Sequence, residues 1–395
     1  MKKTLLLGTT ALMAAGLVAS GAAQAAEEPI TVGLSGYFLT AVAAINENNA
    51  DGEFADASLA TAFDTSSEIS VGGSTTFDNG ITAGLNVQLD PAGFDERHAF
   101  FSGSFGQIQI GQIEGARQQM TNFAPGASTG GMGVNSPHFA FGNGGIAGAF
   151  ATVRTYNDGL GNEDAVKLVY FSPTFNGLRI GLSYAPDDVD NGGYARAVTG
   201  GLGAVNNDLQ AGVEYSNTFG DISVSLSAGF ASANLETCNV NAAGAAVVSS
   251  VNTTNPATAG TLRTTADQNC QDNPSTIAFG GTVSFGEFAI GGGYLETEQV
   301  GNTATGSGRT REDMELGISY ASGPMTLAMQ YGQGDLDDVA GLTDQLSIYE
   351  LQAQYVLGPG VILGAMLAKG EFDDATAGGL DNDYTTLAFG AHLGF

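Results

Sequence analysis

Apolar and polar residues alternate along much of the chain, in segments of similar length. Between 222 and 230, Ile, Val, Leu, Ala and Phe share one face, and Ser and Gly share the other. The segments 178–184, 288–294 and 325–331 show the same alternation. A period of two predicts β-strands, because successive side chains of a strand point to opposite faces.

Short turns separate these segments. They contain Gly, Asn, Asp and Pro, which favour the backbone angles of tight hairpins. Five carry Phe just before the turn, namely Phe77, Phe105, Phe175, Phe219 and Phe285. Seven such turns imply sixteen strands, and they are predicted in 76–81, 104–108, 174–180, 218–224, 284–290, 322–327 and 357–363.

The apolar faces have the length and the aromatic ends of strands that cross a bilayer. A tilted transmembrane strand needs about 9–11 residues, with aromatic girdles at both interfaces. The polar faces contain Gly, Ser, Thr, Ala and Gln with little charge, whereas a soluble β-sandwich would expose Lys and Glu. We therefore predict an all-β fold, a 16-stranded antiparallel transmembrane β-barrel. Ile108 and Ile110 would face lipid, while Gln107 and Gln109 would face a water-filled channel.

Longer connections lie at the opposite end of the predicted strands from the short turns. Short periplasmic turns and long extracellular loops are typical of outer-membrane barrels. The expected loops are 48–62, 90–95, 117–163, 186–207, 234–273, 299–310, 335–341 and 373–379.

The first residues predict export. Lys2 and Lys3 precede an apolar run over 5–18, and small residues follow up to Ala25. This pattern is typical of a signal peptide, here 1–25, which leaves a single barrel domain over 26–395. A transmembrane helix is the alternative, but the run is shorter than the ~20 residues that a span needs.

Charge and motifs exclude several functions. Without Lys2 and Lys3, ten basic against 41 acidic residues leave a net charge of −31, and no basic cluster favours nucleic acid. The three His are scattered, and no H-x-x-x-H or G-x-S-x-G motif indicates an enzyme. The acidic stretches 157–164 and 373–383 are candidate calcium sites, but they lack an EF-hand pattern. We therefore expect their carboxylates to be solvated, and we expect no cofactor.

Three segments, 96–112, 165–184 and 387–395, resemble the Gram-negative general porins of the alphaproteobacterial type. They read ERHAFFSGSFGQIQIGQ, AVKLVYFSPTFNGLRIGLSY and LAFGAHLGF. The resemblance implies passive diffusion of small hydrophilic solutes and ions through a homotrimer in outer-membrane lipid and lipopolysaccharide. It also implies that the barrel assembly machinery reads the terminal Phe395.

In this family the third long loop folds back into the barrel, and basic wall residues face acidic loop residues. We therefore expect the loop 117–163 to narrow the pore, with an outward surface loop as the alternative. Lys167 and Arg179 should point inward, since a cation facing lipid costs ~2–4 kcal/mol near the midplane. The sequence does not decide which face of the wall Arg97 occupies, because apolar residues occur on both faces of its segment. The pore-lining candidates are Arg97, Glu114, Arg117, Arg154, Asp158, Glu163, Asp164, Lys167, Arg179, Glu214 and Glu350.

The acidic loops predict weak cation selectivity that is strongest at low salt. A negative vestibule concentrates cations, and salt screens the effect. A substrate-preferring channel or a surface-displayed barrel adhesin are the alternative functions.

Cys238 and Cys270 are the two cysteines, and in an exported protein they are expected to form one disulfide. A metal site is the alternative, but no His lies nearby in the sequence. Mass spectrometry of a non-reduced digest should find the two cysteine peptides linked. Alkylation of both thiols in the native protein would reject the disulfide.

Overall fold

A computed structural model describes most of the chain outside its first residues. The described residues are 30–47, 60–127, 133–134, 153, 155, 164–187, 205–235, 237–240, 246–248, 273–298, 310–337, 342–375 and 381–395. The predicted signal peptide, 1–25, lies outside them.

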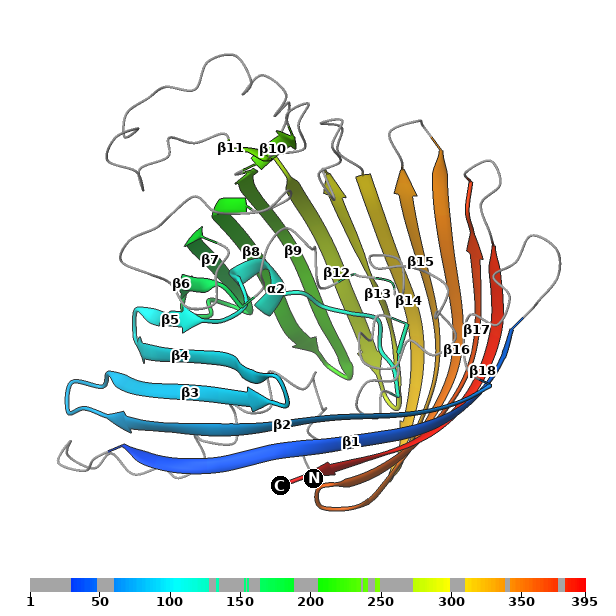
Figure 1. Ribbon diagram of the computed structural model, residues 1–395. Helices are drawn as coiled ribbons and strands as arrows, with labels where there is room; N and C mark the ends of the chain where they lie inside the picture. The colour runs from blue at the N-terminus through cyan, green and yellow to red at the C-terminus, as the bar shows by residue number, and fades with distance from the viewer. Residues whose placement is uncertain are drawn as a thin grey trace.

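Sixteen antiparallel strands pair in one closed ring, which confirms the predicted barrel (Figure 1). The ring closes where β1 pairs with β18. The strands are β1 (Thr31–Glu47), β2 (Thr61–Thr76), β3 (Thr82–Asp90), β4 (Gly93–Gly103), β5 (Gly106–Gln112), β6 (Val166–Phe171), β7 (Leu178–Asp187), β8 (Val205–Phe219), β9 (Ile222–Leu235), β12 (Ser275–Phe285), β13 (Phe288–Glu298), β14 (Thr310–Ser322), β15 (Met325–Asp337), β16 (Thr343–Gly358), β17 (Val361–Asp373) and β18 (Asn382–Gly394).

Two smaller elements lie in the connections. β10 (Thr237–Val240) and β11 (Ala246–Val248) form a hairpin between β9 and β12, and the short helix α2 (Ala116–Gln119) follows β5. No helix in the described ranges is long and apolar enough to cross a membrane.

All seven short turns lie at one end of the barrel, as the sequence predicted. Six of the eight connections at the other end are longer than any of these turns, and the connection between β15 and β16 spans the five residues 338–342. The shortest joins β3 to β4 through Pro91 and Ala92 alone. The expected loop over 90–95 is therefore wrong, because Gly93 to Asp95 continue the strand pairing.

Side chains alternate across the wall as a membrane barrel requires. On β6, Leu168 is 49% exposed on the outer face, while its neighbours Lys167 and Val169 are 3% and 0% exposed on the inner face. On the last strand, Leu387, Phe389 and Leu393 form an exposed outer row. The apolar side chains of the ring thus face lipid.

The inner wall is not polar throughout. Leu39 and Ile45 of β1 point inward and are buried with Met366 of β17 and Ala388 of β18. A second buried cluster joins Val134 and Val153 of the third loop to inner side chains of β15–β17, namely Leu336, Leu346, Ile348 and Phe372. Part of the barrel interior is therefore an apolar core.

The chain end closes the ring. The amide of Phe395 donates to the carbonyl of Gly36 at 3.0 Å, and the amide of Gly36 donates to the carbonyl of Phe395 at 3.1 Å. The Phe395 ring is exposed on the outer side, at the turn end of the wall.

Deletion of Phe395 should slow barrel assembly, because it removes both hydrogen bonds that join the last residue to β1. Pulse-chase measurement of the heat-modifiable, folded form in outer membranes checks this. The variant Phe395→Ala is the control for backbone loss, since it keeps both hydrogen bonds. Equal folding rates for the deletion and the wild type would contradict the assignment.

Candidate pore constriction

The described beginning of the third loop, residues 113–127 after β5, lies inside the barrel against the wall (Figure 1). Its backbone amides donate to inward side chains of distant strands. Ala116 donates to Oγ of Ser183 on β7 at 2.9 Å, and Ala127 donates to Oε1 of Gln352 on β16 at 2.8 Å. The segment 113–127 therefore crosses the inner wall from β7 to β16, as expected of an inward-folded loop.

Apolar contacts fix the beginning of this loop. Ile113, Ala116 and Met120 are buried against Val169 and Phe171, which point inward from β6. Burial of these side chains excludes water from the loop–wall contact, and it stabilises the loop by the hydrophobic effect. The open channel must therefore lie on the other side of the loop.

Two of the predicted pore-lining residues form an ion pair that faces the lumen. Arg179 of β7 and Glu214 of β8 are cross-strand partners, with 2.8 Å between Nε and Oε1. Their side chains are 30% and 27% exposed, and the guanidinium lies over the Phe171 ring, 4.8 Å from its centre. This pair presents balanced charge to the channel.

Other predicted cations are inside the barrel but buried. Lys167 points inward, and its Nζ donates to the carbonyl of Ala165 at 3.3 Å. Arg117 belongs to α2 and is 1% exposed. Both charges are shielded from channel water by the loop or the wall.

Arg97 lies on the outer face of the barrel. Its cross-strand partner is Gln112, and its Nε donates to Oε1 of Gln112 at 2.8 Å. Two positions along, Ala99 pairs with Ile110, which is exposed outward. The sequence could not choose this face, because apolar residues occupy both faces of 96–101.

The predicted carboxylates fall into two places. Glu114 and Asp164 flank the loop, where each interacts electrostatically with the buried Glu96 on the inner face of β4. Glu350 is 5% exposed on the inner face of β16, and its Oε2 accepts from Nε2 of Gln352 at 2.7 Å. Arg154, Asp158, Glu163 and Cys270 lie outside the described residues, and Cys238 is located only to the backbone of β10.

Two acidic wall residues were missed by the sequence analysis. Asp64 and Glu68 lie on the inner face of β2, opposite in direction to the exposed Phe63 and Ile69. Ser70 donates its hydroxyl to Oε1 of Glu68 at 3.0 Å. The alternation of apolar and polar residues over 61–71 could have placed both carboxylates on the inner face. Among the described residues, no group of three or more His, Cys, Asp or Glu could hold a metal ion.

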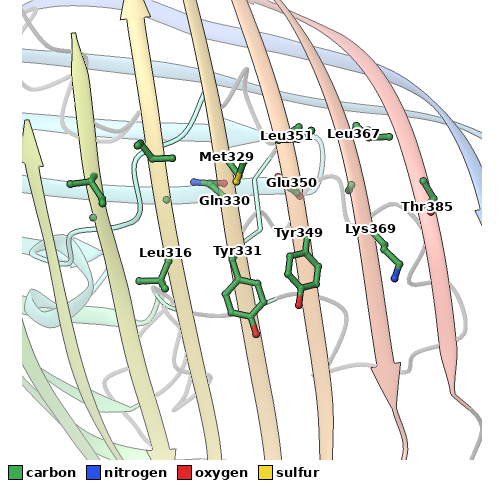
Figure 2. Close-up of a pocket in the computed structure, with 15 residues that line it drawn as sticks. Leu316, Met329, Gln330, Tyr331, Tyr349, Glu350, Leu351, Leu367, Lys369 and Thr385 are labelled. Carbon is green, nitrogen blue, oxygen red and sulfur yellow. The ribbon is translucent and has the colours of Figure 1, made fainter. Parts of the chain in front are cut away.

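A groove of about 610 Å³ lies on the outer wall across β13–β18 (Figure 2). Its floor is apolar, and the Tyr331 and Tyr349 hydroxyls and the Lys369 ammonium group point toward one end of it. Because its apolar side chains Leu316, Met329 and Leu351 are exposed outward, the groove faces the membrane and is separate from the channel.

Comparison with known families agrees with this geometry. A family model described as Gram-negative porin matches residues 8–375. The chain belongs to the Gram-negative porins. It is a multi-pass β-barrel of the outer membrane and a channel for passive diffusion, and both family and fold indicate a channel rather than an enzyme. A search of curated proteins finds no match.

Solved structures share the fold of this porin at low identity. An anion-selective porin from Comamonas acidovorans is 18% identical, with a TM-score of 0.59, over 93% of this chain and 100% of that chain. The channel DcaP of Acinetobacter baumannii is 13% identical, with a TM-score of 0.59, over 94% and 99%. OmpT of Vibrio cholerae, in a trimer form, is 13% identical, with a TM-score of 0.54, over 93% and 100%.

The porin wall also contains a buried ion pair that sequence reasoning did not single out. Nε and Nη2 of Arg311 donate to the two carboxylate oxygens of Asp313 at 2.6 and 2.8 Å, on the inner face of β14. Both side chains are almost fully buried. Loss of one partner would leave a buried charge uncompensated.

Arg311→Leu should therefore destabilise the barrel by about 3–5 kcal/mol, measured by urea unfolding in detergent micelles. The double variant Arg311→Leu/Asp313→Leu should recover most of this loss, since it removes both charges. Lys369 and Glu371 form an exposed pair with the same spacing. Lys369→Leu is the matched control and should change stability little. If Arg311→Leu behaved like this control, the buried pair would have no structural role.

Proposed function

We propose that this porin is weakly cation-selective, and that the inner wall of β2–β4 contributes to the preference. Asp64 and Glu68 of β2 point inward there and are partly exposed. Since Arg97 points outward, these strands present no Lys or Arg to the lumen. The wall beside the loop is therefore acidic.

Few positive charges in the channel offset these carboxylates. Glu214 neutralises Arg179, while Lys167 and Arg117 are buried. Fixed carboxylates that face water raise the local concentration of cations, and the effect weakens as salt shortens the Debye length. The acidic wall is the observation that carries the proposal.

Acidic residues at the extracellular ends of the strands add to the effect. Asp335 and Asp337 lie at the end of β15, Asp373 is the last residue of β17, and Asp374 follows it. They place negative charge where solutes enter. The rim and the wall together favour cations along the entry path.

We further propose that the porin is a homotrimer in outer-membrane lipid and lipopolysaccharide. The OmpT structure of Vibrio cholerae in its trimer form supports this, because the barrel is shared. Cross-linking in mild detergent should give a ladder that ends at three subunits, and a product that stays monomeric at every cross-linker concentration would contradict it.

The zero-current potential of single channels in a KCl gradient tests the ion preference. The potential should have the sign of cation preference, and it should be larger at low mean salt. Glu68→Gln should reduce it, because one carboxylate leaves the acidic wall. Glu312→Gln is the control, since it removes the same charge from the outer face of β14. Anion preference at low salt, or equal effects of the two variants, would refute the role of Glu68.

A further inference from the structure

The inner wall under the third loop repeats one small unit. In each of six strands, a glycine and a polar residue lie two positions apart, so both side-chain positions point inward. The pairs are Gly181 and Ser183 on β7, Gly212 and Gln210 on β8, Gly229 and Ser227 on β9, Gly280 and Thr282 on β12, Gly317 and Glu315 on β14, and Gly332 and Gln330 on β15. We call these twelve residues the loop seat.

Five of the six polar members of the loop seat bind the loop backbone, whereas Gln210 donates to Asp208 on its own strand. Ser227 Oγ accepts from the Asn122 amide at 2.9 Å, and Thr282 Oγ1 donates to the Phe123 carbonyl at 3.1 Å. Glu315 is fully buried, and its Oε1 accepts from the Ala124 amide at 2.8 Å. A backbone inside a barrel needs such partners, because buried unpaired amides are costly.

The glycine members let the loop approach the wall. A Cβ atom on Gly317 would lie 2.5 Å from the carbonyl oxygen of Pro125, and one on Gly212 would lie 2.9 Å from that of Ala116. A Cβ atom on Gly280 would overlap the carbonyl oxygen of Asn122. Each of these obstacles is loop backbone, which no rotamer change can remove.

The glycines and polar residues also form a continuous path across the strands. Gly181 pairs with Gly212, and Gly212 pairs with Gly229. The path then steps to Gly280, which pairs with Ser227, and it crosses β13 at Gly293, which pairs with both Gly280 and Glu315. Further along the ring, Gly317 pairs with Gln330. The loop backbone follows this path from Ala116 to Ala127.

We propose that the loop seat sets the cross-section of the channel. The glycines decide how close the third loop lies to the wall, and the polar neighbours hold it there. A side chain at Gly212, Gly280 or Gly317 would move the loop away from the wall and into the lumen. For Gly317→Ala, an ordinary contact of 3.4 Å with Pro125 requires a shift of about 0.9 Å. The proposal holds whichever ion the channel prefers.

Single-channel conductance of two glycine variants, each with a matched control, tests the loop seat. Gly317→Ala should lower the conductance and the largest neutral solute that passes. Its control is Gly73→Ala on the outer face of β2, where a Cβ atom would also lie 2.5 Å from a backbone oxygen, that of Thr31. The clash is equal, but no loop is involved, so the conductance should equal that of the wild type.

Gly280→Ala should likewise lower the conductance, and Gly281→Ala is its control. Gly281 is the next residue on the same strand and points outward. A Cβ atom there would lie 2.8 Å from the side chain of Leu226 and at an ordinary contact distance, 3.4 Å, from the carbonyl oxygen of Ser225. Heat modifiability reports folding separately, so that a fold defect is not read as a pore effect. If one of the two loop-seat variants fails to fold, the other variant and its control still test the proposal. Wild-type conductance in a folded Gly317→Ala or Gly280→Ala variant would overturn the proposal.

Discussion

The structure depends on one constraint, that no backbone amide or carbonyl within the bilayer can stay without a hydrogen-bond partner. In lipid such a group costs several kcal/mol, so a sheet must have no free edge. Sixteen strands meet this condition by pairing β1 with β18. The last residue extends that pairing, because Phe395 and Gly36 exchange both backbone hydrogen bonds.

The same constraint governs the described segment 113–127 of the third loop, which pairs with no strand. Its amides find Ser183, Ser227, Glu315 and Gln352 on the wall. Those inner polar side chains therefore hold the loop instead of lining water. This explains why Gln109, which we expected to face channel water, is buried and accepts from Gln119 of α2 at 3.1 Å.

The sequence was informative where a local pattern decides the structure. The period of two and the turn residues predicted the sixteen strands and the seven turns, because strands and hairpins depend on neighbours in the chain. The faces of Lys167 and Arg179 followed from the cost of a cation in lipid. The face of Arg97 could not be chosen, since Ala99 and Phe100 make both faces of that segment apolar.

The hydrogen bonds from the loop backbone to the wall could not be predicted, because they join residues that are more than 60 positions apart. The inner faces were predicted as small and polar, yet nothing local distinguishes Gly280 under the loop from a glycine in open water. The acidic wall was missed for a related reason. Asp64 and Glu68 make the wall acidic because Arg97, two strands away on β4, points outward and does not offset them. The outward direction of Arg97 depends on the strand register.

Solute uptake by liposomes tests most directly the central claim, an aqueous channel narrowed by a loop on its inner wall. Purified folded porin in liposomes should cause swelling in isotonic neutral sugars, with rates that fall steeply as the sugar becomes larger. Removal of residues 116–127 should raise the rate for the larger sugars, since the loop would no longer narrow the channel. Absence of swelling with the smallest sugar, or rates that do not depend on these loop residues, would contradict the account.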